Sequence, residues 1–227
     1  AGMSEHVRLG YTPHSWEIIP NGFDVARFAP DLEAKFDYRS VLKIPNDCLV
    51  VGLIGRYHPT KGHELFLEAV DRMRQVCPRV VAVLAGTGVD RENAVLVGKI
   101  RKLELQAHVH LLGAGGNVEQ DTNVLDVLVC ASSTEGFPNV IGEAMACGVP
   151  CVSTDVGDCK WIIDDSGVVV HERSPAGIAE GCLKLLQKSV TERKRLGARA
   201  REIIVKRFPL GSVTSQYERL YESICFD

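Results

Sequence analysis

Short apolar runs rich in β-branched residues alternate with helical patterns along most of this sequence, and this alternation limits the possible folds more than any other feature. Six runs are expected to be strands: residues 49–54, 80–84, 109–112, 124–129, 150–153 and 168–170. Most of them are apolar at consecutive positions, as strands covered by helices on both faces are. The order of elements predicts an α/β domain with a doubly wound, Rossmann-like parallel sheet and helices on both faces.

Helical signals occupy the segments between these runs. Four apolar residues at helical spacings predict one buried stripe between the first two strands: Leu65, Ala69, Met73 and Val76. Ser174-Pro175 offers an N-cap followed by proline, and Ser189 with Glu192 has the spacing of a capping box. Because no repeat, low-complexity tract or long linker divides the chain, one domain is expected.

Charge, hydropathy and cysteine content exclude several classes of protein. The formal net charge of −3 offers no basic face for nucleic acid. The longest strongly apolar run, residues 48–55, is far shorter than the roughly 20 residues that span a bilayer, and no signal-peptide pattern opens the chain. The eight cysteines form no C-x-x-C pair, so we expect mostly buried, reduced thiols in a cytoplasmic protein.

The most informative segment, residues 132–150, follows the fourth apolar run. Gly136 is expected to allow a tight turn, Pro138 to occupy the first turn of a helix, and Gly148-Val149-Pro150 to end that helix before the next strand. The backbone N–H groups of residues 137–140 would then point out of the helix N-terminus. The helix dipole favours an anion there, such as a diphosphate.

Two glutamates and two cations are predicted to meet at this site. Glu135 is expected at the mouth of this site. Glu143 shares a helix face with Asn139, so its carboxylate would reach the same cleft and accept hydrogen bonds from ribose hydroxyls. Two carboxylates beside a phosphate require compensating cations. Arg56 and Lys61 follow the first strand and therefore reach the same sheet edge, where they would neutralise charge on a leaving diphosphate.

Glu135 and Glu143 form an E-x7-E pattern within EGFPNVIGEAMACGVP, and this run resembles the EGFPNVxxEAMAxGxPVV run of glycosyltransferase family 4. Other segments resemble the family's in the same order along the chain: residues 19–24, Arg56 with Lys61-Gly62, Gly86-Thr87-Gly88, Leu112-Gly113 and residues 154–158. The resemblance extends from about residue 16 to the last helix. It implies the C-terminal, donor-binding half of a two-domain GT-B enzyme.

The resemblance also implies a role for each site residue in a retaining transferase. Arg56 and Lys61 would bind the donor diphosphate and Glu143 the ribose, while Glu135 belongs to the catalytic site without being assigned as a nucleophile. The donor-binding residues expected in addition are Glu143, Gly136, Phe137, Pro138, Asn139, Val140, Leu112, Gly113 and Gly86. Of these, Leu112 and Gly113 would lie near the base.

The same resemblance sets expectations for cofactors and partners. No D-x-D sequence occurs, and Arg56 with Lys61 takes the place of a cation, so neither a metal nor another cofactor is expected. Ala1-Gly2 is expected to be a tag remnant, and residues 3–227 the donor-binding domain. The expected partners are a nucleotide-diphosphate sugar and an N-terminal acceptor domain that this chain lacks, so the isolated chain is expected to be inactive in transfer.

Membrane contact is expected only through that second domain. This would place the full-length enzyme in the cytoplasm, peripheral to the inner face of the membrane. A role in cell-surface polysaccharide synthesis is the corresponding hypothesis.

Two other functions remain open at this stage. An NAD(P)-dependent oxidoreductase would share the parallel sheet, although Gly86-x-Gly88 lacks the third glycine of the dinucleotide fingerprint. A non-catalytic nucleotide-binding module would keep the same residues without the reaction. A thermal-shift comparison of nucleoside diphosphates with dinucleotides separates the oxidoreductase from both other functions.

Overall fold

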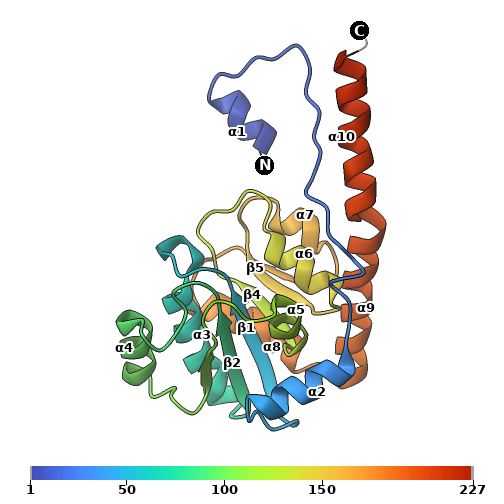
Figure 1. The fold of residues 1–227 in the computed structure, drawn as a ribbon. Helices are drawn as coiled ribbons and strands as arrows, with labels where there is room; N and C mark the ends of the chain where they lie inside the picture. Colours follow the sequence, from blue (N-terminus) through green and yellow to red (C-terminus); the bar gives the residue numbers. More distant parts are fainter. Residues whose placement is uncertain (1, 226–227) are drawn as a thin grey trace.

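The framework of this computed structural model, which describes residues 2–225, is a six-stranded parallel sheet (Figure 1). Its strands are β1 (Leu49–Ile54), β2 (Val80–Ala85), β3 (Val109–Leu111), β4 (Val127–Cys130), β5 (Cys151–Thr154) and β6 (Val168–Val170). They lie in the order β3-β2-β1-β4-β5-β6, and every neighbouring pair is parallel. The doubly wound sheet is therefore confirmed, with its strand order reversing between β1 and β4.

The fourth strand lies later in the chain than its apolar run predicts. Val124 caps the C-terminus of a short helix, and the Leu125 N–H donates to the carbonyl of Thr122. Asp126 then accepts a hydrogen bond from the N–H of Val50, 2.8 Å away, before β4 begins at Val127. The prediction of a strand from residue 124 was wrong, because buried apolar residues occur at the C-terminus of a helix as readily as at the start of a strand.

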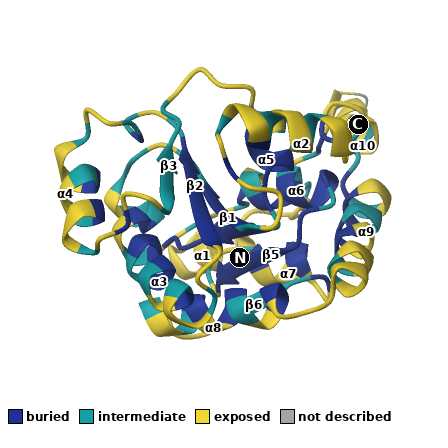
Figure 2. Ribbon diagram, turned by 90° about the horizontal axis from the view of Figure 1, so that it is seen from below, coloured by how far each residue is buried: buried dark blue, intermediate teal, exposed yellow. Residues whose placement is uncertain are grey.

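Helices cover both faces of the sheet, and Figure 2 shows the central strands buried between them, whereas the edge strand β3 is only partly buried. One face is covered by α3 (His63–Val76), α4 (Ala94–Lys102) and α8 (Pro175–Leu186), and the other by α2 (Leu32–Val41), α5 (Val118–Asn123), α6 (Asn139–Ala146), α7 (Cys159–Ile163) and α9 (Val190–Arg207). A 3-10 turn, η1 (Pro59–Lys61), precedes α3. The remaining helices are α1 (Gly2–Arg8) and α10 (Leu210–Cys225), and α10 projects beyond the sheet (Figure 1).

Two predicted helix starts are confirmed. The Ser174 hydroxyl accepts a hydrogen bond from the N–H of Gly177, and Pro175 opens α8. Ser189 and Glu192 form a reciprocal capping box at the start of α9. Both serines satisfy backbone donors that the first helical turn leaves unpaired.

The apolar stripe predicted for α3 is only partly correct. Ala69 and Met73 are fully buried, but Val76 is 60% exposed. The buried face also includes Phe66, Leu67 and Val70. The helix packs against both β2 and α8, so its buried surface is broader than one stripe. A pattern of four apolar residues does not show which residues at the margin of such a broad surface are exposed to solvent.

Phe23 joins the two ends of the domain. Its N–H donates to the carbonyl of Phe208, its own carbonyl accepts from the N–H of Leu210, and its ring lies against α6 at Gly142. A Cβ atom at Gly142 would fall 2.0 Å from the ring carbon Cζ of Phe23. The absence of a side chain at Gly142 therefore makes room for this ring.

Five of the eight cysteines lie in the core as free thiols, in keeping with the prediction: Cys130, Cys147, Cys151, Cys159 and Cys182. Cys225 is exposed. Within residues 2–225, no helix combines the length and apolarity needed to cross a bilayer. Of the predicted tag remnant, Ala1 lies outside the described residues and Gly2 begins α1.

Candidate active site

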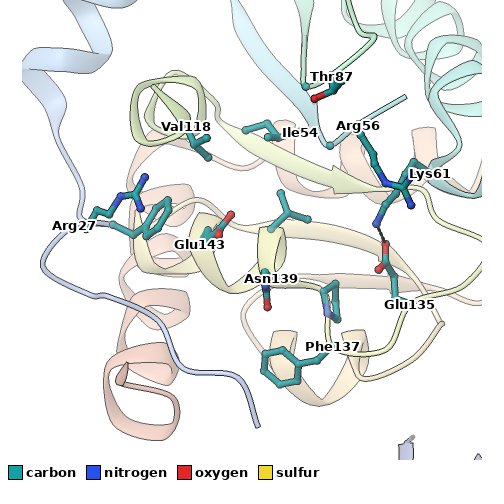
Figure 3. A pocket seen from close by; sticks show the side chains of 15 residues that line it. Arg27, Ile54, Arg56, Lys61, Thr87, Val118, Glu135, Phe137, Asn139 and Glu143 are labelled. Atoms are coloured by element: carbon teal, nitrogen blue, oxygen red, sulfur yellow. Dashed lines mark hydrogen bonds and ion pairs between the residues drawn. The ribbon is translucent and has the colours of Figure 1, made fainter. Parts of the chain in front are cut away.

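A cleft of about 570 Å³ opens at the carboxyl edge of the sheet, where the strand order reverses between β1 and β4 (Figure 3). Segments that follow β1, β2 and β4 contribute most of its lining. In a doubly wound sheet this is where the connections diverge to opposite faces and leave space for a ligand. The strand ends that the sequence singles out therefore meet at this cleft.

The cleft brings together most of the predicted residues. Those that line it are Arg56, Lys61, Gly86, Glu135, Phe137, Pro138, Asn139, Val140 and Glu143. Gly136, Leu112 and Gly113 do not line it. Gly113 contacts a lining residue instead, because its carbonyl accepts a hydrogen bond from the N–H of Gly86.

Glu135 is the most constrained side chain in the cleft. Its Oε1 atom lies 2.6 Å from Nζ of Lys61 (Figure 3). The same atom accepts a hydrogen bond of 2.6 Å from the hydroxyl of Ser132. The Glu135 side chain is 11% exposed, that of Lys61 is 28% exposed, and Ser132 is buried. Two donors on one carboxylate oxygen fix the orientation of Glu135 toward the cleft.

The backbone that carries Glu135 rests on the segment after β5. The Asp158 N–H donates to the carbonyl of Gly136, and the Thr154 hydroxyl donates to the carbonyl of Ser132 at 2.7 Å. Gly157 has φ +55°, and a Cβ atom there would fall 2.3 Å from the carbonyl oxygen of Glu135. Gly136 itself has no left-handed backbone, so the glycine that this turn requires is Gly157.

Helix α6 points its N-terminus into the cleft. Pro138 is its N-cap, one residue earlier than the predicted first turn, and no side chain caps the helix. The Asn139 side chain accepts a hydrogen bond from the Asn21 amide at 2.8 Å, which ties the helix start to the segment that opens the domain. The uncapped end therefore presents backbone N–H groups and a positive dipole end to the cleft.

The loop between β1 and α3 carries the two predicted cations. The Tyr57 N–H donates to the carbonyl of Thr87, and a Cβ atom at Gly86 would fall 2.3 Å from the carbonyl of Gly55. The turns after β1 and β2 are thus packed together, and this gives Gly86 its structural role. Arg56 is exposed and has no ion pair with any other residue in the described part of the chain.

His63, the first residue of α3, packs beneath this loop in the core and contacts its backbone at Gly55. It is 2% exposed, and its Nε2 atom lies 3.3 Å from the carbonyl of Gly55, so Nε2 carries the proton and Nδ1 keeps a lone pair. Among residues 2–225, Nδ1 is the one buried side-chain nitrogen or oxygen without a hydrogen-bond partner. Burial, with a smaller contribution from Lys61, lowers the pKa of His63 to about 4.

Acidification is therefore expected to destabilise the protein through His63. The unfolded chain takes up this proton near pH 6.5, whereas the folded chain resists protonation until its pKa near 4, so stability is lost as pH falls between these values. The loss amounts to at most about 3 kcal/mol. Denaturant unfolding at several pH values should show a flatter acid limb for His63→Gln, and an unchanged limb would contradict this assignment.

Glu143 lies half-buried on α6, facing a charged pair. Burial raises the pKa of its carboxyl, nearby Arg27 lowers it and Glu119 raises it. Arg27 is ion-paired with Glu119 rather than with Glu143. Within the described residues, no group donates a hydrogen bond to the Glu143 carboxylate, which leaves it able to accept bonds from a ligand.

Sequence reasoning did not identify six lining residues: Arg27, Phe28, Ile54, Gly55, Thr87 and Val118. Gly55 and Thr87 stand inside segments with a predicted role, beside the residues chosen. Arg27 and Phe28 come before β1, so reasoning confined to strand ends could not find them. Their place in the cleft depends on how the segment that precedes α2, which contains both residues, packs against α6.

The dinucleotide alternative receives no support from this geometry. Gly86-x-Gly88 follows β2, whereas the fingerprint of a dinucleotide site occupies the first β-α turn. That turn, after β1, has the sequence GRYHPTKG. Among residues 2–225, no cluster of three or more His, Cys, Asp or Glu side chains is placed to hold a metal ion.

Comparison with known proteins identifies the family. Residues 48–188 match the family model of glycosyl transferases group 1. The chain belongs to this family. The group 1 glycosyltransferase fold accounts for the sheet order and for the cleft at its reversal, and the chain has the Rossmann-like architecture of one half of a GT-B enzyme.

Relatives of this group 1 glycosyltransferase are longer proteins. It is 30% identical over 162 residues to N-acetyl-alpha-D-glucosaminyl L-malate synthase of Bacillus anthracis, covering 70% of this chain and 42% of that protein. It is 32% identical over 190 residues to the lipopolysaccharide core biosynthesis glycosyltransferase LpsE of Rhizobium meliloti, covering 82% and 53%. The chain thus spans about half the length of the curated relatives that it matches.

Solved structures agree with this assignment. Sucrose-phosphate synthase from Thermosynechococcus elongatus superposes with a TM-score of 0.87 at 23% identity, covering 98% of this chain and 56% of that chain. The C-terminal domain of the group 1 glycosyltransferase LpcC from Francisella tularensis gives a TM-score of 0.72 at 27% identity, covering 83% of this chain and all of that one. The LpcC structure is that of a domain solved by itself.

Proposed function

We propose that this chain binds the nucleoside-diphosphate sugar donor of a retaining glycosyltransferase. The observation that carries the proposal is the meeting of Lys61 and Glu135, 2.6 Å apart, in a cleft that also contains exposed Arg56 and the uncapped N-terminus of α6. Two cations and a row of backbone N–H groups suit a diphosphate. A carboxylate held at the same point suits the sugar hydroxyls next to it.

The diphosphate is the part of the donor that these cations address. During transfer the bond from the anomeric carbon to the diphosphate breaks, and negative charge grows on the leaving oxygen. Lys61 and Arg56 stabilise that charge, and no metal is required in this proposal. The acceptor hydroxyl forms the new bond on the same face and passes its proton to the leaving phosphate, which preserves the anomeric configuration.

Glu143 is assigned to the ribose. Its half-buried carboxylate receives no hydrogen bond from the described residues, and burial raises its pKa because the charged form lacks solvation. Two ribose hydroxyls would supply donors to that carboxylate. This contact would compensate for the burial of Glu143 and would orient the nucleoside between α6 and the turn after β2.

The comparisons support a nucleotide sugar as the ligand class. HepE from Anabaena, a structural neighbour with a TM-score of 0.87 and 23% identity, was solved in complex with UDP-glucose. We place the acceptor site on a second, N-terminal domain of the full-length enzyme, which acts in the cytoplasm or peripheral to the inner membrane face. A role in cell-surface polysaccharide synthesis is supported by the similarity to LpsE.

Isothermal titration of the chain with UDP, GDP and ADP tests the donor site. One of these nucleotides is expected to bind, and Glu143→Ala should weaken it about tenfold or more by removing the ribose contacts. Glu180→Ala, an exposed glutamate on α8 away from the cleft, serves as the matched control. NAD is titrated in parallel, and tighter binding of NAD than of any nucleoside diphosphate, or equal losses in both variants, would contradict the assignment.

Ser132 is expected to position Glu135 during catalysis. When a diphosphate draws Lys61 away, the Ser132 hydroxyl remains as the donor to Glu135 Oε1. Ser132→Ala in the full-length enzyme should lower kcat about tenfold while the donor KM stays near its original value. Ser132→Thr keeps a hydroxyl and should restore most of the rate. A loss of rate in proportion to thermal stability, without rescue by threonine, would instead indicate a packing role.

A further inference from the structure

A second cleft, of about 740 Å³, lies at the opposite edge of the sheet from the candidate active site. It runs between α2 and α9, and its floor is made by residues just ahead of β1, β4 and β5, such as Cys48, Asp126 and Pro150. The candidate active site uses the carboxyl ends of the same strands. The two clefts are therefore separate sites, and the proposed transfer reaction does not use the second one.

Apolar side chains form part of the wall of this cleft and are left open. Leu32 and Phe36 on α2 are 59% and 50% exposed, and Val190 at the start of α9 is 60% exposed. Leu125 and Val149 continue the apolar surface into the floor, where both are buried. A ligand with an apolar body would remove these side chains from water.

Cations outnumber carboxylates in the cleft. Five cationic side chains line it, namely Lys35, Arg39, Arg193, Lys194 and Arg201, against three carboxylates, Asp31, Asp47 and Asp126. The whole chain has a net charge of −3, so this surplus is local. It gives the cleft a positive potential that favours an anion.

Each of the three carboxylates is already engaged by the protein. Asp31 caps α2 by accepting from the N–H of Ala34 at 2.8 Å. Asp47 is paired at 2.8 Å with Arg79, which does not line the cleft. Asp126 is shared by two cations at the floor of the cleft. Asp47 and Asp126 are thus neutralised by cations of the protein, which leaves the single charge of Asp31 against the three α9 cations that line the cleft.

Lys35 and Arg39 converge on Asp126. Their nitrogen atoms lie 2.9 and 2.8 Å from its two carboxylate oxygens. Lys35 also donates to the carbonyl of Leu125 at 2.8 Å, which occupies two of the three N–H bonds of its ammonium group. Burial lowers the pKa of Lys35; Asp126 opposes this shift, while Arg39 and Arg193 add to it.

Among residues 2–225, the α9 cations that line the cleft, Arg193, Lys194 and Arg201, form no ion pair with a carboxylate, although other cations of α9 do. Arg193 donates only to the backbone carbonyls of Leu186 and Lys188, which leaves its charge unpaired. Lys194 has no ion pair with any residue between 2 and 225, and it is exposed at the cleft. An acidic group placed between α2 and α9 would meet Lys194 and the remaining donor of Lys35.

We propose that this cleft binds a small amphipathic anion, with a carboxylate or phosphate head group near Lys35 and Lys194 and an apolar body along Leu32 and Phe36. The head group would balance the cations that the protein leaves unpaired. The apolar body would cover side chains that are otherwise exposed. Cys147 and Gly148, at the C-terminal end of α6, also line this cleft, so its occupant would contact the opposite end of the helix that opens the donor site.

Four matched probes test the proposal by isothermal titration on the whole chain: octanoate, octyl phosphate, octylamine and inorganic phosphate. The first three each contain eight carbon atoms, counting the carboxylate carbon of octanoate, but differ in charge, and the last is an anion without an apolar body. Octanoate or octyl phosphate is expected to bind at least about tenfold more tightly than octylamine and inorganic phosphate. The preference between the two head groups separates a carboxylate ligand from a phosphate ester.

Neighbouring charge reversals on α9 locate the binding. Lys194→Glu should weaken the anionic amphiphile about tenfold, whereas Arg195→Glu, the same change at an exposed residue that does not line the cleft, should leave it within about twofold. Saturating nucleoside diphosphate should not displace the amphiphile. The proposal is overturned if no anionic amphiphile binds the folded chain, if octylamine binds equally well, if both variants lose affinity equally, or if the nucleotide competes.

Discussion

Replacing Lys61 with methionine is expected to lower kcat/KM for the proposed transfer by about 10²–10³-fold in the full-length enzyme. Methionine keeps most of the length of the side chain and removes its charge. Lys61 Nζ lies 2.6 Å from Glu135, so it stands where a diphosphate would develop negative charge beside that carboxylate. Without it, that charge would be stabilised by Arg56 and the N-terminus of α6 alone.

Steady-state kinetics with a lipid-linked or oligosaccharide acceptor series would measure this loss. Lys160→Met is the matched control, because Lys160 is an exposed lysine on α7, also beyond the carboxyl edge of the sheet, and it does not line the cleft. We expect the control to keep nearly full activity. If both variants retained activity, Lys61 would have no part in stabilising the leaving group, and the proposed role of the cation pair would have to be abandoned.

Replacing Asp126 with alanine is expected to cause a large loss of stability, about 3–5 kcal/mol. Its carboxylate pairs with Lys35 and with Arg39, which is only 3% exposed, and it also accepts the Val50 N–H. Removing it leaves two cations beside each other with no counter-charge. Equilibrium unfolding in urea would measure the difference.

Asp47→Ala provides the comparison for that experiment. Asp47 forms an ion pair of the same length, 2.8 Å, with Arg79, but the two side chains are 62% and 70% exposed. Solvent screens such a pair, so its removal should change the free energy of unfolding far less than the removal of Asp126 does. Similar losses in the two variants would show that burial does not set the strength of the Asp126 cluster.

The sheet was predictable because its strands are buried on both faces. Residues 49–54 and 168–170 are apolar at almost every position, and both runs became strands with the predicted bounds. The run from residue 124 misled because Val124 and Leu125 are equally apolar but close α5. An apolar run indicates that its residues are buried, but it does not indicate whether they belong to a helix or a strand. Here the N-cap at Asn117 is the feature that distinguishes this short helix from a strand.

The gathering of the predicted site residues followed from topology. Lys61 and Glu135 are 74 positions apart in sequence, yet both follow neighbouring parallel strands, so the sheet itself brings them to one edge. Arg27 could not be found in this way, since it precedes the first strand and reaches the cleft through the fold of a loop. Whether each residue binds the donor as proposed remains a prediction for nucleotide titration to test.

The second cleft lay outside the reach of sequence reasoning for a similar reason. Lys35 and Lys194 belong to helices at opposite ends of the chain, and neither stands in a motif. Only the packing of α2 and α9 on the same side of the sheet places these charges around one space.

The contact between Phe23 and Gly142 has a consequence for how sequences in this family diverge. The aromatic ring occupies the volume that a β-carbon on α6 would need, so position 142 cannot gain a side chain while a phenylalanine occupies position 23. A descendant that acquired a larger residue at position 142 would survive most readily after position 23 had become smaller. Across homologues, the two positions should therefore covary inversely in side-chain volume, although they lie 119 positions apart in the chain.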